Sequence, residues 1–139
     1  MLQKDFYQLI KLSPHGDEDG KLISLENGSL PFKIKRVYYI YNTRNKVIRG
    51  KHSHKKLQQL IIALAGSCTF KLVSPLGKNH IVMNDPEKAL FIGPSVWREM
   101  TNFSKDCIIL VLASENYNEA DYVRNFDEYK KSTRAIYGT

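Results

Sequence analysis

Short runs of β-branched, aliphatic and aromatic residues, each ended by a turn signal, recur along most of this 139-residue chain. Gly66, Ser74–Gly77 and Gly93–Pro94 supply turn signals between them. The runs are Phe32–Tyr41, Leu60–Leu64, Cys68–Val73, His80–Met83, Ala89–Ile92 and Cys107–Ala113. Many short strands at such close spacing predict an all-β fold, a sandwich or a barrel of antiparallel strands.

The pattern changes near the C-terminus. Ala120, Val123, Phe126 and Tyr129 recur at helical spacing, with Asn118 as a candidate N-cap. These residues predict a C-terminal helix over about 118–134, after a barrel over about 20–114. A chain of this length is typical of one domain, so we expect residues 1–139 to fold as a single unit.

Two features bear on where the protein works. No apolar run approaches the ~18 residues that a membrane span requires, so we expect no membrane insertion. Cys68 and Cys107 lie far apart in apolar runs and form no CxxC motif. They are predicted to be buried free thiols, which favours a reducing compartment, the cytoplasm.

Positive charge is concentrated in one stretch. The chain has 21 Lys and Arg against 14 Asp and Glu, but residues 27–84 hold 11 Lys and Arg and no acidic residue. Such a block fits nucleic acid, a small phosphorylated ligand, or simply a solvated basic face. Tyr38, Tyr39 and Tyr41 within it suit either stacking on bases or alternate faces of a strand. The charge pattern alone does not separate these interpretations.

The residues with the clearest chemistry are His52 and His54. On a strand, a His-x-His pair puts both imidazoles on one face, about 7 Å apart along the chain. That spacing suits two ligands of one metal ion, or two proton-transfer groups beside one small substrate. A pair of surface histidines on a basic loop is the alternative.

Two motifs then resemble those of the cupins. His52, His54, Gln59 and Gly66 have the spacing of the first cupin motif, with Gln59 where Glu is usual. Gly93–Asn102 fits the frame of the second, with Arg98 where His is usual. The resemblance implies a jelly-roll barrel. Because Gln is a weak ligand and Arg cannot ligate, we expect neither a metal nor another cofactor.

A longer set of matching segments points to one family within the cupins. The segments are Lys35–Ile40, Arg49–Gln59, Gly66–Cys68, Gly93–Met100, Val111–Ser114 and Asp121–Arg124. Together they resemble the nucleotide-sugar 3,4-ketoisomerases, small metal-free cupins that act on dTDP-4-keto-6-deoxyglucose. The resemblance implies conversion of that substrate to the 3-keto sugar through an enediol, for deoxyamino-sugar and surface-glycan biosynthesis. It also favours a homodimer, with exchanged N-terminal strands, that binds no nucleic acid.

The same resemblance implies roles for individual residues. His54 is favoured as the main catalytic base and His52 as its partner, although position alone does not order the two. Tyr38 is the candidate hydroxyl that donates to the enolate oxygen. Arg36 and Arg49 are the candidates for clamping the pyrophosphate, because guanidinium pairs bidentately with phosphate oxygens.

Other residues are expected to support substrate binding. Gln59 is expected to orient a histidine, and Trp97 to pack in the core while lining the sugar pocket. Lys51 and Lys55 are expected to contribute positive electrostatic potential near the pyrophosphate rather than direct contacts. Arg98 resembles family members that yield the gluco rather than the galacto product.

Two positions depart from the pattern behind the gluco assignment. Asp19 stands where relatives often carry Arg or Tyr, and an acid is unfavourable beside a phosphate. Lys51 stands where an aromatic residue is common. Two other functions remain open on the sequence alone: an epimerase of a similar keto-sugar, and a non-enzymatic module that binds nucleic acid or senses sugars through the basic stretch.

Overall fold

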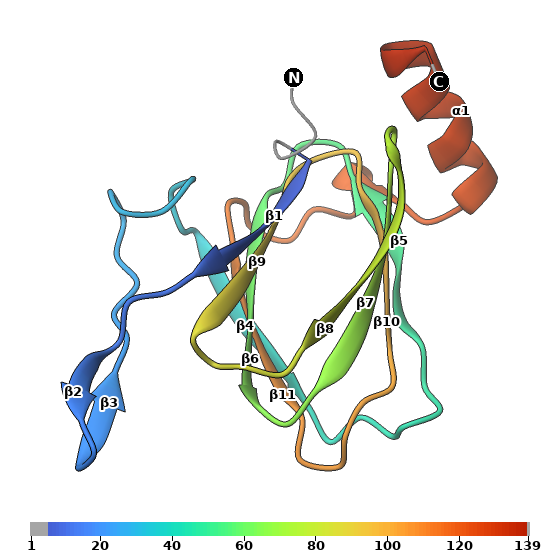
Figure 1. Cartoon of the computed structure of the whole chain (residues 1–139). Helices are drawn as coiled ribbons and strands as arrows, with labels where there is room; N and C mark the ends of the chain where they lie inside the picture. The colour runs from blue at the N-terminus through green and yellow to red at the C-terminus, as the bar shows by residue number, and fades with distance from the viewer. Residues whose placement is uncertain (1–5, 139) are drawn as a thin grey trace.

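The computed structural model describes residues 6–138, which form two five-stranded antiparallel sheets and a C-terminal helix (Figure 1). The first sheet has the order β1-β9-β6-β11-β4, formed by Tyr7–Lys11, Lys88–Ile92, Gln59–Ala65, Ile108–Ala113 and Arg36–Tyr41. The second has the order β12-β5-β10-β7-β8, formed by Tyr122–Val123, Arg49–His54, Trp97–Thr101, Cys68–Ser74 and Gly77–Met83. The prediction of an all-β barrel with a C-terminal helix is confirmed.

The core lies between the two sheets. Along β6, β7, β9 and β11 successive side chains point to opposite faces of the sheet, so every second one points into the core. The buried cluster includes Ile61, Phe70, Leu72, Leu90, Ile92, Ile109 and Val111. Cys68 and Cys107 are free thiols buried in the same cluster, as the sequence predicts.

A second apolar cluster lies on the outer face of the first sheet. Phe32–Tyr41 was expected to be one strand, but only Arg36–Tyr41 pairs as β4. Phe32 instead packs with Leu60 and Leu112, because the first sheet is apolar on both faces. The barrel also begins earlier than residue 20, since β1 pairs with β9.

The hairpin β2–β3, formed by His15–Asp17 and Gly20–Leu22, pairs only with itself. It extends away from the barrel, at the lower left of Figure 1.

The C-terminal helix starts later than predicted. Asn118 caps only a 3-10 turn, Glu119–Asp121, and Tyr122–Val123 then pairs with β5 as strand β12. Helix α1 spans Phe126–Tyr137, with Asn125 as its N-cap. Strand pairing therefore overrides the helical spacing before residue 126. No helix within residues 6–138 is long and apolar enough to cross a membrane.

Candidate active site

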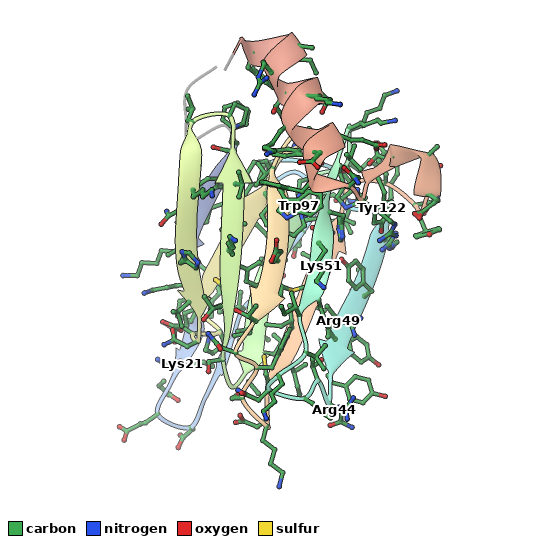
Figure 2. All side chains as sticks on the ribbon, turned by 90° about the vertical axis from the view of Figure 1, so that its right-hand side faces the viewer. Lys21, Arg44, Arg49, Lys51, Trp97 and Tyr122 are labelled. Carbon is green, nitrogen blue, oxygen red and sulfur yellow. The ribbon has the colours of Figure 1, made fainter. Side chains whose placement is uncertain are left out.

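An open cleft of about 610 Å³ lies between β4, the edge strand of the first sheet, and the β5–β12 pair of the second. Figure 2 views the molecule from the β5 side, with Arg49, Lys51 and Tyr122 labelled. The side chains lining the cleft include Arg36, Tyr38, Arg49, His52, Tyr122 and Arg124. Four of these six were expected from the sequence.

A β-bulge in β5 determines which of its side chains face the cleft. Arg98 of β10 pairs with His52, whereas the next residue of β10 pairs with Gly50, so Lys51 is an extra residue. Gly50 and Lys51 both have positive φ, 85° and 57°. The extra residue resets the alternation of the strand. Arg49 therefore shares a face with His52, which simple alternation would forbid.

The two histidines lie edge to face, with ring centroids 4.8 Å apart. The Nδ1 of His52 lies 3.0 Å from the carbonyl oxygen of Gly50, and the Nδ1 of His54 lies 3.1 Å from Oδ2 of Asp121. Both partner oxygens can only accept, so Nδ1 carries the proton in each ring. The Nε2 atoms are then the basic nitrogens. The Nε2 of His54 is buried and has no hydrogen-bond partner among residues 6–138.

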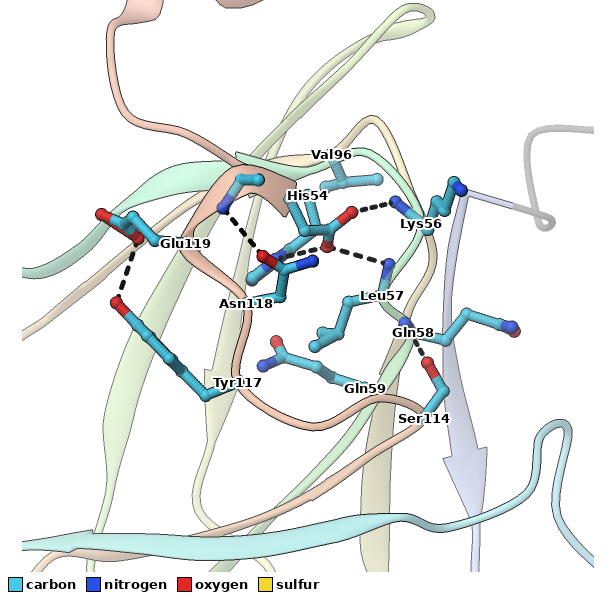
Figure 3. Close-up of polar contacts among 12 residues, drawn as sticks. His54, Lys56, Leu57, Gln58, Gln59, Val96, Ser114, Tyr117, Asn118 and Glu119 are labelled. Atoms are coloured by element: carbon cyan, nitrogen blue, oxygen red, sulfur yellow. Dashed lines mark hydrogen bonds and ion pairs between the residues drawn. The ribbon is translucent and has the colours of Figure 1, made fainter.

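Asp121 fixes the position of His54. Figure 3 shows the hydrogen bonds of His54, Lys56 and Leu57 at this point. The carboxylate of Asp121 also accepts hydrogen bonds from the backbone N–H groups of Lys56 and Leu57, at 2.8 and 3.2 Å. Its backbone carbonyl accepts another from Lys55. The carboxylate is therefore held by the turn between β5 and β6, and it holds the imidazole of His54 in one tautomer and orientation.

Both imidazoles are held in the neutral form. Burial, followed by the nearby positive charge of Arg98, lowers the pKa of His52 to about 4. Burial, then Arg98, lowers the pKa of His54 still more strongly. The guanidinium of Arg98 is buried and donates to the carbonyl oxygen of Val96 through Nε and Nη2. Two uncharged bases beside a fixed cation are suited to removing a proton and stabilising the anion that results.

The opposite wall carries Tyr38. Burial raises the pKa of its phenol. The guanidinium of Arg36 lies over its ring, 4.6 Å from the centroid. Gln59 was expected to orient a histidine, but its amide donates to the Tyr38 hydroxyl at 2.9 Å and accepts a hydrogen bond from Arg98. The amide of Gln59 therefore connects the tyrosine to the buried arginine.

The cleft arginines differ in their charge partners. Arg124 is paired with Glu119, at 2.7 and 3.0 Å. Within residues 6–138 neither Arg36 nor Arg49 forms an ion pair with a carboxylate, and Nη1 of Arg36 is buried without a hydrogen-bond partner. Two unpaired guanidinium groups on facing walls form a binding place for an anionic group.

Six of the ten expected residues do not line the cleft: His54, Gln59 and Arg98 are buried beside it, and Trp97, Lys51 and Lys55 lie away from it. Trp97 precedes Arg98 on β10 and so points to the opposite face, where it packs against Phe126 of α1 and donates to Glu99. The structure therefore supports its packing role and not a place in the sugar pocket. Lys51 and Lys55 are exposed and do not line the cleft.

The sequence analysis assigned no role to the 121–124 segment. The ring of Tyr122 lies 4.8 Å from that of His52 and 4.3 Å from that of His54, and the guanidinium of Arg124 lies 4.2 Å from the tyrosine ring. Asp121, Tyr122 and Arg124 match the family pattern in the sequence but were given no role in the site, because the segment was interpreted as helical. The i, i+2 spacing of Tyr122 and Arg124 is the strand signal that was available.

The positions that bind metal in other cupins do not fit a cation in this chain. They hold His52, His54, Gln59 and Arg98, and the oxygen of the Gln59 amide already accepts from the guanidinium. A fixed positive charge beside two imidazoles repels a divalent ion. Among residues 6–138, no group of three or more His, Cys, Asp and Glu side chains is arranged to hold a metal.

Comparison with known proteins first defines the class. The chain belongs to the family described as FdtA, WxcM-like, C-terminal, whose model matches residues 5–134. It is 46% identical over 116 residues to the TDP-4-oxo-6-deoxy-α-D-glucose-3,4-oxoisomerase of Aneurinibacillus thermoaerophilus, covering 83% of this chain and 84% of that protein. The nucleotide-sugar ketoisomerase resemblance seen in the sequence is confirmed.

Solved structures agree with this family. A histidine-to-asparagine mutant of the 3,4-ketoisomerase QdtA from Thermoanaerobacterium thermosaccharolyticum, in complex with TDP-4-keto-6-deoxyglucose, is 44% identical, with a TM-score of 0.92 over 99% of both chains. The TDP-quinovose 3,4-ketoisomerase WlaRB from Campylobacter jejuni is 44% identical, with a TM-score of 0.86 over 90% of this chain and 97% of that one. The RmlC epimerase of Mycobacterium tuberculosis, at 14% identity over 88% of this chain and 70% of that one, with a TM-score of 0.72, shares the fold alone.

Proposed function

We propose that this protein is a sugar-nucleotide 3,4-ketoisomerase that converts dTDP-4-keto-6-deoxyglucose to dTDP-3-keto-6-deoxyglucose. The observation that carries the proposal is the pair of neutral imidazoles, His52 and His54, held with their Nε2 atoms basic beside a cleft with unpaired guanidinium groups. The relatives named above act on, or bind, the same kind of substrate.

The reaction needs two proton transfers at carbon. A base removes the proton on C3, which is acidic because it is α to the C4 ketone, and an enediolate forms. A proton donor neutralises the oxygen at C4. Loss of the proton on the C3 hydroxyl and delivery of a proton to C4 then complete the shift of the carbonyl. Atoms and charge balance with no redox partner and no metal.

We assign the first proton abstraction to His52. The family resemblance favours His54, but the side chain of His54 is fully enclosed, whereas His52 lines the cleft. His54, oriented by Asp121, is the second acid–base group. Tyr38 faces the sugar oxygens from the opposite wall, and Arg36 and Arg49 bind the pyrophosphate.

We propose the gluco product. Arg98 matches the family members with that outcome, and a relative named as a TDP-quinovose ketoisomerase, quinovose being 6-deoxyglucose, is 44% identical to this chain. Asp19, which opposed this assignment, lies on the β2–β3 hairpin, outside the residues that line the cleft.

The deciding experiment is incubation with dTDP-4-keto-6-deoxyglucose in D2O, followed by NMR of the sugar. Isomerisation puts deuterium on C4 and a ketone on C3, and the coupling constants of the C4 proton in H2O report gluco or galacto geometry. Exchange at C3 or C5 with the ketone still at C4 indicates epimerisation and contradicts the proposal. Absence of exchange, with salt-dependent binding to oligonucleotides, favours a nucleic-acid module. Added EDTA is expected to leave the rate unchanged.

We further propose that the enzyme works in the cytoplasm as a homodimer. The two free, buried thiols suit a reducing compartment. Strand β4 is a sheet edge whose outer face exposes Val37, Tyr39 and Tyr41, and the β2–β3 hairpin projects from the barrel (Figure 1). An exposed apolar edge of this kind is commonly covered by a second copy. Light scattering is expected to give twice the 16.0 kDa chain mass.

A further inference from the structure

The hydrogen bonds between Arg98, Gln59 and Tyr38 form a chain with one possible direction. The Nη1 of Arg98 is bonded to Oε1 of Gln59, and Nε2 of Gln59 is bonded to the Tyr38 hydroxyl at 2.9 Å. Arg98 is 2% exposed and Gln59 4%, so bulk water does not compete for these bonds.

The chemistry of the groups fixes the direction. Guanidinium can only donate, so the amide atom of Gln59 facing Arg98 must be its oxygen. The other amide atom, facing Tyr38, must then be the NH2 group, which can only donate. The hydroxyl oxygen of Tyr38 is therefore the acceptor, and its own proton is directed elsewhere. The donor-only guanidinium of Arg98 alone therefore determines which way the Gln59 amide is oriented.

The remaining question is where that proton points. Among residues 6–138, no group accepts a hydrogen bond from the Tyr38 hydroxyl, and Tyr38 lines the cleft. We infer that Gln59, held by Arg98, is a positioning residue that forces Tyr38 to present its proton to the cleft. Tyr38 is then the proton donor to the sugar oxygen and not the base that removes the proton from carbon.

This arrangement suits the reaction proposed above, on which the inference rests. As the C3 proton moves to the imidazole, the phenol gives its proton to the oxygen at C4. The phenolate left behind is stabilised by the Gln59 N–H and by the charges of Arg36 and Arg98. It then takes the proton from the C3 hydroxyl, while the imidazolium gives the proton that it removed from C3 to C4 and returns to its neutral form. Tyr38 is restored at the end of the cycle, and the proton count balances.

The test is Gln59→Glu, with Gln59→Met as the matched control. The new carboxylate stays ionised beside Arg98 and can only accept, so the Tyr38 hydroxyl turns toward it and away from the cleft. Loss of a positioned proton donor costs on the order of 10²–10⁴-fold in rate, so we expect kcat to fall about a hundredfold. KM is expected to change little, since Arg36 and Arg49 are untouched. Gln59→Met removes the amide without giving the Tyr38 hydroxyl a new acceptor. Its kcat is expected to lie between that of the native protein and that of Gln59→Glu.

The second measurement is a double-mutant cycle with Tyr38→Phe. We expect Tyr38→Phe to lower kcat about a hundredfold in the native protein. In the Gln59→Glu background it is expected to cost almost nothing, because the hydroxyl is already turned away. An equal cost of Tyr38→Phe in both backgrounds overturns the inference, as does a Gln59→Glu enzyme more active than Gln59→Met. Neither result touches the proposed function, which depends on turnover by the unmodified protein in the same assay.

Neutron diffraction from deuterated crystals supplies a readout that needs no activity and no variant. We expect two deuterons on the Gln59 nitrogen, one of them directed at Tyr38, and the phenol deuteron directed into the cleft. A phenol deuteron directed at Gln59 overturns the inference.

Discussion

The two walls of the cleft are built in different ways and supply opposite chemistry. On β4, Arg36 and Tyr38 are two residues apart on a regular strand, and both face the cleft by simple alternation. On β5, Arg49 and His52 are three residues apart and face the same way only because the strand bulges at Lys51. The regular wall presents a phenol hydroxyl, and the bulged wall presents a neutral imidazole.

This difference places a protonated phenol and neutral imidazoles on opposite walls of one cleft. Tyr38 keeps its proton because burial raises its pKa, while His52 stays unprotonated because burial and Arg98 lower its pKa. Arg98 lies close to both walls, bonded to Gln59 on one side and paired with His52 along β10 on the other. Its one buried charge therefore favours the base form of the histidine and stabilises the anion that the tyrosine leaves.

The largest expected effect comes from removing the base on the bulged wall. His52→Asn is expected to lower kcat about 10³-fold, within the range typical of a lost general base. Affinity for TDP should stay within about threefold, because the guanidinium groups remain. Steady-state kinetics and calorimetric titration with TDP measure the two quantities.

Two comparisons sharpen that result. His54→Asn removes the second basic nitrogen and is expected to reduce kcat by a smaller factor, since His54 is enclosed whereas His52 lines the cleft. His80→Asn, on the exposed β8 strand, is the matched control and should leave kcat unchanged. If His52→Asn keeps the native kcat, or if His54→Asn lowers kcat far more than His52→Asn does, His54 is the base.

The next effect comes from the bulge itself. A Cβ added at Gly50 would lie 2.9 Å from the carbonyl oxygen of Arg98, on a backbone with φ of 85°. Gly50→Ala is expected to destabilise the fold by about 1–3 kcal/mol. It should also weaken TDP binding, because relaxing the bulge moves Arg49 out of register with His52. Denaturant unfolding and TDP titration measure the two effects.

Gly77→Ala is the matched control for the bulge. Gly77 has φ of 134° in the β7–β8 turn, and a Cβ there would meet nothing within 4 Å. It should lower stability through backbone strain and leave TDP affinity unchanged. Equal TDP affinities for the two variants would show that the bulge does not position Arg49.

The contrast between the walls also explains what the sequence predicts and what it does not. The β4 wall follows from alternation in Phe32–Tyr41, and the His-x-His pair follows from the same rule. The sequence does not reveal the bulge, because nothing in Arg49-Gly50-Lys51 states that the partner strand skips a residue. Trp97 was expected in the pocket although its neighbour Arg98 points inward, and two adjacent residues of a strand cannot both do so.

The 118–125 part of the predicted 118–134 helix was misinterpreted for another physical reason. Its three-residue spacing of apolar side chains fits a helix, and Asn118 is a good cap. Pairing of Tyr122–Val123 with β5 and the hydrogen bonds of Asp121 are long-range contacts that a local pattern does not contain. The sequence therefore did not show that Asp121 orients His54, while the predicted helix exists from Phe126 onward.

The smallest expected effect concerns pH and tests the electrostatic side of the comparison. An ordinary histidine has a pKa near ~6.5, whereas His52 in the fold has a pKa of about 4. The neutral, basic form therefore persists as pH falls below 6.5. We expect kcat/KM to hold nearly constant from pH 8 to about 5 and to decline only as the pH approaches the lowered pKa.

The same shift affects stability with a definite sign. Between about pH 4 and 6.5 the unfolded chain binds protons at His52 that the native state does not, so stability declines as the pH is lowered through this window. Arg98→Met removes the second-largest cause of the shift and should move the acid limb of kcat/KM upward, though not as far as 6.5, since burial remains. Lys78→Met, on the distant exposed strand β8, removes an equal charge and should leave the limb in place. Two results would show that Arg98 does not keep His52 in its basic form. One is a native kcat/KM that already falls near pH 6.5, and the other is an equal shift of the acid limb of kcat/KM in Arg98→Met and Lys78→Met.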